Sequence, residues 1–218
     1  MGLIRWWKKR KKQKEEEIKK QEEEIKKQEE ADRKQRELTR RKNLLHEVRI
    51  ELEQERKNHK IDTSISSSDI DAYFQKALDA HAQKQGAKVA FTYFEKAALG
   101  GHKRAPYCLG LLYHMNYGPD GYETVSYEDK KENIIKWFTM AAIYGHPEAA
   151  YLLGEIYHDD MQNAETPEEY NALERNALKW CSMAADTGLA RWAEVDIERY
   201  LLGQTLYRNP NSPYIKKS

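Results

Sequence analysis

Apolar residues recur at helical spacing within two phrases that repeat along the middle of the chain. The first phrase reads NIIKWFTMAAIYG at residues 133–145 and NALKWCSMAADTG at 176–188, with a looser copy, VAFTYFEKAALGG, at 89–101. The second reads HKRAPYCLGLLYH at 102–114 and HPEAAYLLGEIYH at 146–158. Repetition at a fixed period of this size is typical of stacked helix pairs, so the pattern predicts an all-α repeat array.

The residue types in these repeated phrases have a physical reason. Trp137 and Ala141 share one helical face, where the indole covers area and the small residue lets a neighbouring backbone approach. Gly145 stands where a helix needs a left-handed end. Gly110 and Gly154 recur inside helical runs, where glycine costs about 1 kcal/mol against alanine, so each predicts a close helix crossing. Each unit is therefore expected to be two helices with a tight joint.

The phrases resemble the Sel-one-like repeats, relatives of the tetratricopeptide repeats. The resemblance lies in residues 105–118 with 137–145 and in residues 149–157 with 180–188, and it covers about residues 87–203. The connections at 118–128 and 159–165 depart from the family pattern, and the last copy decays where Asp196 and Ile197 replace Leu-Gly. The resemblance implies an α-solenoid of stacked helix-turn-helix repeats. It also implies an adaptor of the kind found in bacterial and eukaryotic signalling and at membranes.

Residues 1–14 form a basic aromatic segment. Four large apolar residues, Leu3, Ile4, Trp6 and Trp7, stand among seven Lys and Arg, which include Lys8, Lys9 and Arg10, and no acidic residue comes before Glu15. Indoles favour the bilayer interface and cations favour an anionic leaflet, so we expect a membrane contact. Two alternatives remain open: nucleic acid, which also attracts cations and aromatic rings, and a solvated helix start without a ligand.

Residues 15–57 predict one long charged helix. The heptads EEEIKKQ at 15–28 place Glu four residues before Lys, an order that stabilises a helix with no core to pack against. Leu38, Leu45 and Leu52 recur at seven, with Val48 between the last two, and this stripe predicts a coiled coil and a homo-oligomer through residues 38–52. The alternative is a disordered charged tail.

A Ser-rich linker is expected at 58–68, the array at 69–203, and an irregular tail at 204–218. Ser68 and Asp71 suggest a capping box that begins the first array helix, and Thr166 with Glu169 suggests another. The expected array helices are 69–85, 87–100, 103–117, 129–144, 147–159, 167–187 and 189–202.

Charge is divided between the two ends of the chain. Residues 1–60 contain 21 basic and 14 acidic residues, whereas the remainder contains 16 and 22. Two cysteines, Cys108 and Cys181, are too few for a disulfide framework and indicate a reducing compartment. No apolar run is long enough for a membrane span or a signal peptide. We therefore expect a cytoplasmic protein that is peripheral on the inner face of a membrane.

No recognised catalytic, cofactor or metal motif is present, so we expect no enzymatic site, no cofactor and no bound metal. The histidines at the helix joints and ends are explained by packing and capping. We expect a protein or peptide to bind along the leading helices of the array, where we expect six candidate contacts to be exposed: Lys103, Arg104, His114, Glu148, Glu155 and His158. Two alternatives are a structural protein that self-associates through a coiled coil and, from scattered precedent in the family, a hydrolase.

Overall fold

The structure, a computed structural model, describes all residues except 1, 60, 62–63, 83–86, 123–125 and 187–218. The described chain is all-α apart from one two-stranded ribbon, which confirms the predicted fold class at this level. The helices are α1 (Gly2–Asn58), α2 (Ser67–Ala82), α3 (Ala87–Leu99), α4 (Ala105–His114), α5 (Tyr127–Ile143), α6 (Pro147–Met161) and α7 (Pro167–Asp186), and the strands are β1 (Tyr117–Gly118) and β2 (Gly121–Tyr122).

The chain divides into two compact units, Met1–Asn43 and the part from Leu44 onward. In the first unit, α1 has mostly exposed side chains, and its ion pairs lie within one helical turn. Lys27 Nζ lies 3.0 Å from Glu23 Oε1, and Lys34 Nζ lies 2.7 Å from Glu30 Oε1. Pairs at this spacing stabilise an isolated helix by a few tenths of a kcal/mol each. The predicted helix over residues 15–57 is confirmed, but α1 begins earlier, at Gly2 within the segment 1–14, and ends one residue later, at Asn58.

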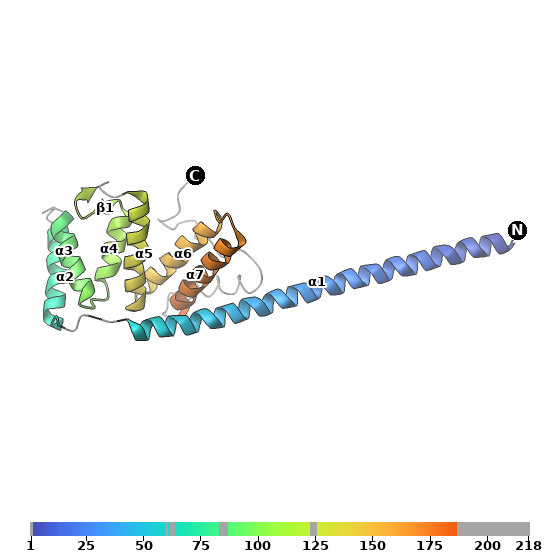
Figure 1. Cartoon of the computed structure of the whole chain (residues 1–218), viewed down its shortest axis with the longest axis horizontal. Coiled ribbons are helices and arrows are strands. Elements are labelled where there is room, and N and C mark those ends of the chain that lie inside the picture. Colours follow the sequence, from blue (N-terminus) through green and yellow to red (C-terminus); the bar gives the residue numbers. More distant parts are fainter. Residues whose placement is uncertain (1, 60, 62–63, 83–86, 123–125, 187–218) are drawn as a thin grey trace. The chain divides into compact units, whose positions relative to one another are not determined.

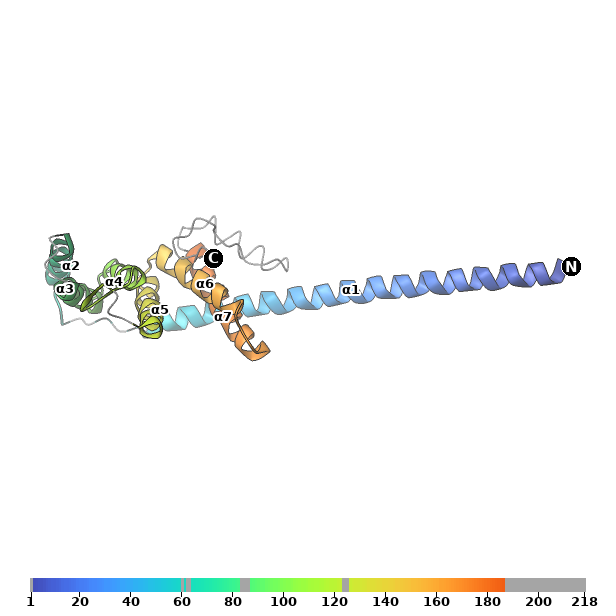
Figure 2. The same cartoon turned by 90° about the horizontal axis from the view of Figure 1, so that it is seen from above.

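In the second unit, consecutive helices pack most extensively as α2 with α3, α4 with α5, and α6 with α7. Both views show these neighbours side by side (Figures 1 and 2). Helix α3 also packs on α4, and α5 packs on α6. Each pair therefore contacts the pair that follows it.

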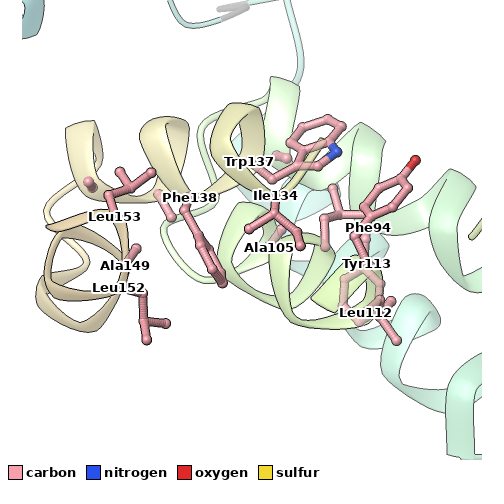
Figure 3. Packing of buried hydrophobic residues seen from close by; sticks show 14 of the residues in the cluster. Phe94, Ala105, Leu112, Tyr113, Ile134, Trp137, Phe138, Ala149, Leu152 and Leu153 are labelled. Atoms are coloured by element: carbon pink, nitrogen blue, oxygen red, sulfur yellow. The ribbon is translucent and has the colours of Figure 1, made fainter. Parts of the chain in front are cut away.

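One continuous core runs through the three pairs. Figure 3 shows Phe138 of α5 in the layer between α4 and the α6 residues Ala149 and Leu152. Phe138 is fully buried, and Trp137 and Trp180 are buried as the repeat pattern requires. A Cβ on Gly110 would lie 2.4 Å from the Phe138 ring, so glycine is needed at this crossing, as predicted.

Gly154 repeats the same arrangement one pair later. A Cβ there would lie 2.6 Å from Sγ of Cys181, and Cys181 stands at the position equivalent to Phe138. The smaller cysteine replaces the ring, yet the contact remains too close for any side chain on the facing helix. The recurrence of glycine in the sequence thus marks two equivalent crossings.

The joints, which are the turns that connect one helix pair to the next, are also equivalent. Gly145 has φ of 88° and donates to Ala142 O, while His146 N donates to Ala141 O at 2.9 Å. This is the Schellman arrangement, which satisfies the last carbonyls of α5. Gly101 and His102 make the same two bonds at the end of α3, with φ of 94° at Gly101.

The caps of two helices test the sequence predictions. Thr166 Oγ1 accepts from the Glu169 N–H at 3.1 Å, as expected for α7. For α2, the prediction was wrong by two residues: Ser66 Oγ, not Ser68, accepts from the Asp69 N–H, and it also donates to the Asp69 carboxylate. Two overlapping sets of Ser and Asp, Ser66 with Asp69 and Ser68 with Asp71, have the same spacing, so spacing alone does not distinguish them.

The connection between α4 and α5 contains β1 and β2, which pair antiparallel across Pro119 and Asp120. Asn116 precedes them in the left-handed region with φ of 64° and accepts a hydrogen bond from Lys130 Nζ. This ribbon occupies the connection that departs from the repeat pattern. The predicted helix 189–202 and tail 204–218 lie outside the described residues.

Candidate interaction surfaces

The basic aromatic segment forms the beginning of α1. Trp6 and Trp7 are exposed by 54% and 62%. The Arg10 guanidinium lies 5.0 Å from the Trp6 ring centroid, and Lys11 Nζ lies 5.9 Å from that of Trp7. Lys8, Lys9 and Lys12 are exposed, and Leu3 and Ile4 belong to the same helix. The segment therefore presents indoles and cations together on a helix.

The six predicted partner contacts do not form one cluster. Lys103, Arg104 and Glu148 are exposed, and all three lie at the start of a leading helix. His114 is the last residue of α4, ten residues and about 15 Å of helix from Arg104. The array therefore places these residues at two different ends of its leading helices.

The prediction that all six are exposed was wrong for part of the set. His158 is only 7% exposed, and Glu155 and His114 are half-buried. They were expected to be exposed on the leading helices, but the folded array covers these three side chains partly or fully. The exposed contacts are those at the joints.

Each joint also contains a stacked histidine. The His102 ring stacks on Phe74 of α2 with centroids 3.9 Å apart, and the His146 ring stacks on Tyr107 of α4 at 4.0 Å. His102 Nδ1 accepts from the Ala105 N–H at 3.1 Å, so the imidazole caps α4. Each joint histidine thus bridges the leading helix of one pair and the start of the next.

Burial lowers the pKa of both joint histidines below the ordinary value. A nearby carboxylate acts in the opposite direction and raises the pKa: Asp71 for His102, and Glu148 for His146. The His146 Nδ1 atom lies 3.1 Å from Glu148 Oε2. Both imidazoles are therefore neutral at neutral pH, which suits the acceptor role of His102.

Residues 44–58 of α1 pack along α7, a contact that the sequence did not predict. Val48 is fully buried with Ala177 and Leu178, and Leu52 is 5% exposed in the main core. Arg175 pairs with Glu47, at 3.0 Å, and with Glu51, and Lys179 pairs with Glu55. Arg49 Nε donates to Ser182 Oγ at 2.8 Å. The glutamates recur every four residues and so follow one side of the helix.

This contact changes the interpretation of the leucine stripe. The stripe predicted a homo-oligomer through residues 38–52, but Val48 packs on α7 and Leu52 lies in the main core of the same chain. A coiled coil through these positions would first have to separate them from these contacts. The boundary at Leu44 also lies inside the segment 15–57, which was expected to be a single piece.

A second surface that sequence reasoning missed lies on the first helix pair. The rings of Tyr73 and Tyr93 stack with centroids 6.1 Å apart. Lys96 Nζ lies 5.6 Å from the Tyr73 centroid and 5.8 Å from that of Tyr93, and Lys76 Nζ lies 5.7 Å from Tyr93. The available signal was the repeat alignment, which places Tyr93 opposite Trp137.

The chain was compared with protein-family models, with curated proteins and with solved structures. None matches it.

Burial raises the pKa of the Cys108 thiol, the opposite of what activates a nucleophile. No group of three or more His, Cys, Asp and Glu side chains in the described part of the chain is placed to hold a metal ion. Of the helices that the structure describes, none combines the length and apolar character needed to cross a bilayer.

Proposed function

We propose that this protein is a non-enzymatic adaptor in which a solenoid of Sel-one-like repeats binds a protein or peptide partner. The duplicated joint is the observation that supports this proposal most directly. A left-handed glycine, a stacked histidine and a glycine crossing recur at equivalent positions in successive pairs. Joints of one geometry stack pairs in a regular way, and solenoids built in this manner present extended surfaces suited to macromolecular partners.

The exposed joint residues are the best candidates for partner contact. Lys103 and Arg104 immediately precede α4, and Glu148 lies in the first turn of α6, so both signs of charge are available at the same end of the leading helices. The acidic excess of residues 61–218 favours a partner of basic or mixed charge at long range. We expect such charges to determine the association rate and the choice of partner more than the final affinity.

Affinity capture with the full chain tests this proposal. The bait must retain residues 44–58, because their removal would expose Ala177 and Leu178. Arg104→Glu with Glu148→Lys should lose the captured partner while the array keeps its helical content by circular dichroism. The matched control is Lys42→Glu with Glu53→Lys, which changes the same charges at exposed positions of α1. A chain that captures nothing above background, by capture with and without cross-linking, would contradict the adaptor proposal.

We also propose that the start of α1 tethers the adaptor to an anionic membrane. The exposed Trp6 and Trp7 supply interfacial indoles, and the surrounding cations are worth about 1 kcal/mol each near an anionic leaflet. We expect salt-sensitive binding to vesicles containing phosphatidylserine, lost in Trp6→Ala/Trp7→Ala. Vesicles of phosphatidylcholine alone are the control. Binding to single-stranded DNA but to neither vesicle would favour the nucleic-acid alternative instead.

A further inference from the structure

One stripe of residues occurs three times in the array and is buried to a different degree each time. It lies on the second helix of each pair. Its members are Val89, Tyr93 and Lys96 in α3, Asn133, Trp137 and Met140 in α5, and Asn176, Trp180 and Met183 in α7. In α7, Trp180 and Met183 are buried, and in α5, Trp137 is buried with Met140 half-buried. In α3, Val89 and Lys96 are exposed and Tyr93 is half-buried.

The stripe faces the preceding helix pair. Tyr144 follows Trp137 by two helical turns on the same side of α5, and its hydroxyl donates to Ala98 O of α3 at 3.1 Å. Figure 3 shows Trp137 on the side of α5 toward Phe94 and Tyr113. The first pair has no such neighbour along Val89, Tyr93 and Lys96 among the described residues. The position that the preceding pair occupies beside Trp137 is therefore left open at the first pair.

We call this surface the open face and define it by Tyr73, Lys76, Val89, Tyr93 and Lys96. Its centre is the stacked pair of tyrosines, and its border is the two exposed lysines that lie over their rings. Neither lysine forms an ion pair with a described residue. The carboxylate of Asp69, one turn before Tyr73, accepts a hydrogen bond from Ser66 instead.

We propose that the open face docks an amphipathic helix of the partner protein, with apolar or small residues along its centre and carboxylates on its flanks. This inference rests on the proposed adaptor function and specifies one surface and one partner chemistry. A helix is the occupant because a helix, α3, fills the equivalent position beside Trp137 and Tyr144 of the second pair. Carboxylates on the flanks of that helix fit because the two lysines at the border have no carboxylate partner among the described residues.

A second copy of the same surface fits poorly. Packing two open faces together would bring four lysines, Lys76 and Lys96 from each copy, around one aromatic centre. Like charges at such a contact oppose association and exclude the wrong partner. The local positive charge is also consistent with the acidic excess elsewhere in residues 61–218, because a partner of mixed charge can use both.

Two designed helical peptides provide the probe. They share one Leu and Ala stripe and differ only in flanking residues, Glu in one and Lys in the other. We expect the Glu peptide to bind the full chain about tenfold more tightly than the Lys peptide by fluorescence anisotropy, the effect of roughly two exposed ion pairs. Lys76→Glu/Lys96→Glu should reverse this preference, and Tyr93 should shift in NMR spectra of the wild type on addition of the Glu peptide.

The control variant is Lys42→Glu/Lys136→Glu, which makes the same change of net charge at exposed lysines outside the open face. It should keep the wild-type preference. Equal binding of both peptides, a preference unchanged in Lys76→Glu/Lys96→Glu, or no binding of either peptide would overturn the inference. The captured cellular partner gives a further test. If Lys76→Glu/Lys96→Glu still captures it and Arg104→Glu/Glu148→Lys does not, the inference about the open face is wrong. The adaptor proposal would then still stand.

Discussion

The helix of residues 2–43 and the helices of the array share a secondary structure but not its cause. In the first, Ile18 and Ile25 are exposed by 47% and 57%, and the ion pairs join residues three or four apart. In the array, Phe138 and Leu153 are fully buried and packed on other helices. The first region is held by local interactions and the second by contacts between segments distant in sequence.

This difference determines how each region should respond to change. Local pairs contribute a few tenths of a kcal/mol each and act almost independently, so no single residue is essential. A close-packed core instead concentrates several kcal/mol on individual side chains. Residues 44–58 belong to α1 by continuity but to the array by packing, and they are the most direct place to test the comparison.

Truncation should give the largest effect. Removing residues 1–58 deletes Val48 and Leu52, two buried side chains worth about 1.5–3 kcal/mol each. We expect the unfolding free energy of the array to fall by about 3–6 kcal/mol in urea denaturation. Removing only residues 1–43 is the control and should leave the transition midpoint unchanged. A midpoint that is the same for both truncations would show that residues 44–58 are not part of the array.

Trp137→Ala should destabilise the array by about 3–5 kcal/mol, because it leaves a large cavity between the first two pairs. The measurement is urea denaturation followed by circular dichroism. Trp6→Ala is the matched control: its side chain is exposed, and the midpoint should not move. A loss of less than 1 kcal/mol in Trp137→Ala would mean that the core of the array is not close-packed.

Gly110→Ala should cost about 1–3 kcal/mol despite the better helix propensity of alanine, since the new methyl group meets the Phe138 ring. Gly110→Ala/Phe138→Leu tests the cause and should recover part of the loss. At Gly145 a methyl group meets nothing within 4 Å, and the left-handed φ alone should cost about 1–2 kcal/mol. No recovery from Phe138→Leu would argue against the steric explanation.

The joint histidines make the array sensitive to mild acid. Burial lowers the pKa of His102 and of His146, so the unfolded chain binds protons more readily than the folded one. Their contribution to stability is complete above the unfolded pKa, about 6.5, and is lost as the pH falls below it toward the folded values. Thermal melts between pH 7.5 and 5 should show this decline, and His102→Gln/His146→Gln should reduce its slope.

The helix of residues 2–43 should lose helical content only at a lower pH, and this should be the smallest of the expected effects. Hydrogen bonds from Arg40, and next from Arg41, lower the pKa of Glu37 to about 2. Its contribution is present above the ordinary value of 4.5 and is lost as the pH falls toward 2, and solvent screening keeps it small because the side chain is 42% exposed. Circular dichroism of the wild type and Glu37→Gln between pH 6 and 2 should differ only slightly, with the wild type more helical above pH 4.5.

Several features could be predicted because they depend on local sequence or on the repeat itself. The long helix follows from Glu and Lys four apart, the buried Trp137 and Trp180 follow from their recurrence, and the left-handed end at Gly145 follows from glycine in a fixed place. The predicted exposure of His158 was wrong, because periodicity identifies the face of a helix on which a residue lies but not how far neighbouring helices cover that face.

The leucine stripe has a related ambiguity. A heptad of leucines indicates that a helix needs an apolar partner, but it does not say whether that partner is another chain or α7 of the same chain. The interaction surfaces were equally difficult to predict: the tyrosines and lysines of the open face come from α2 and α3, and no spacing within either helix joins them.

By itself, the sequence determined that this protein is helical, where most helices begin and end, and which residues face a core, because periodicity, capping and glycine conformation act over a few residues. Only the tertiary structure decided that residues 44–58 pack on α7, and that the stripe whose tryptophan is buried in α5 and in α7 is uncovered in α3. These outcomes depend on which surfaces meet, and that is set by contacts between residues up to about 130 positions apart, such as Arg49 and Ser182.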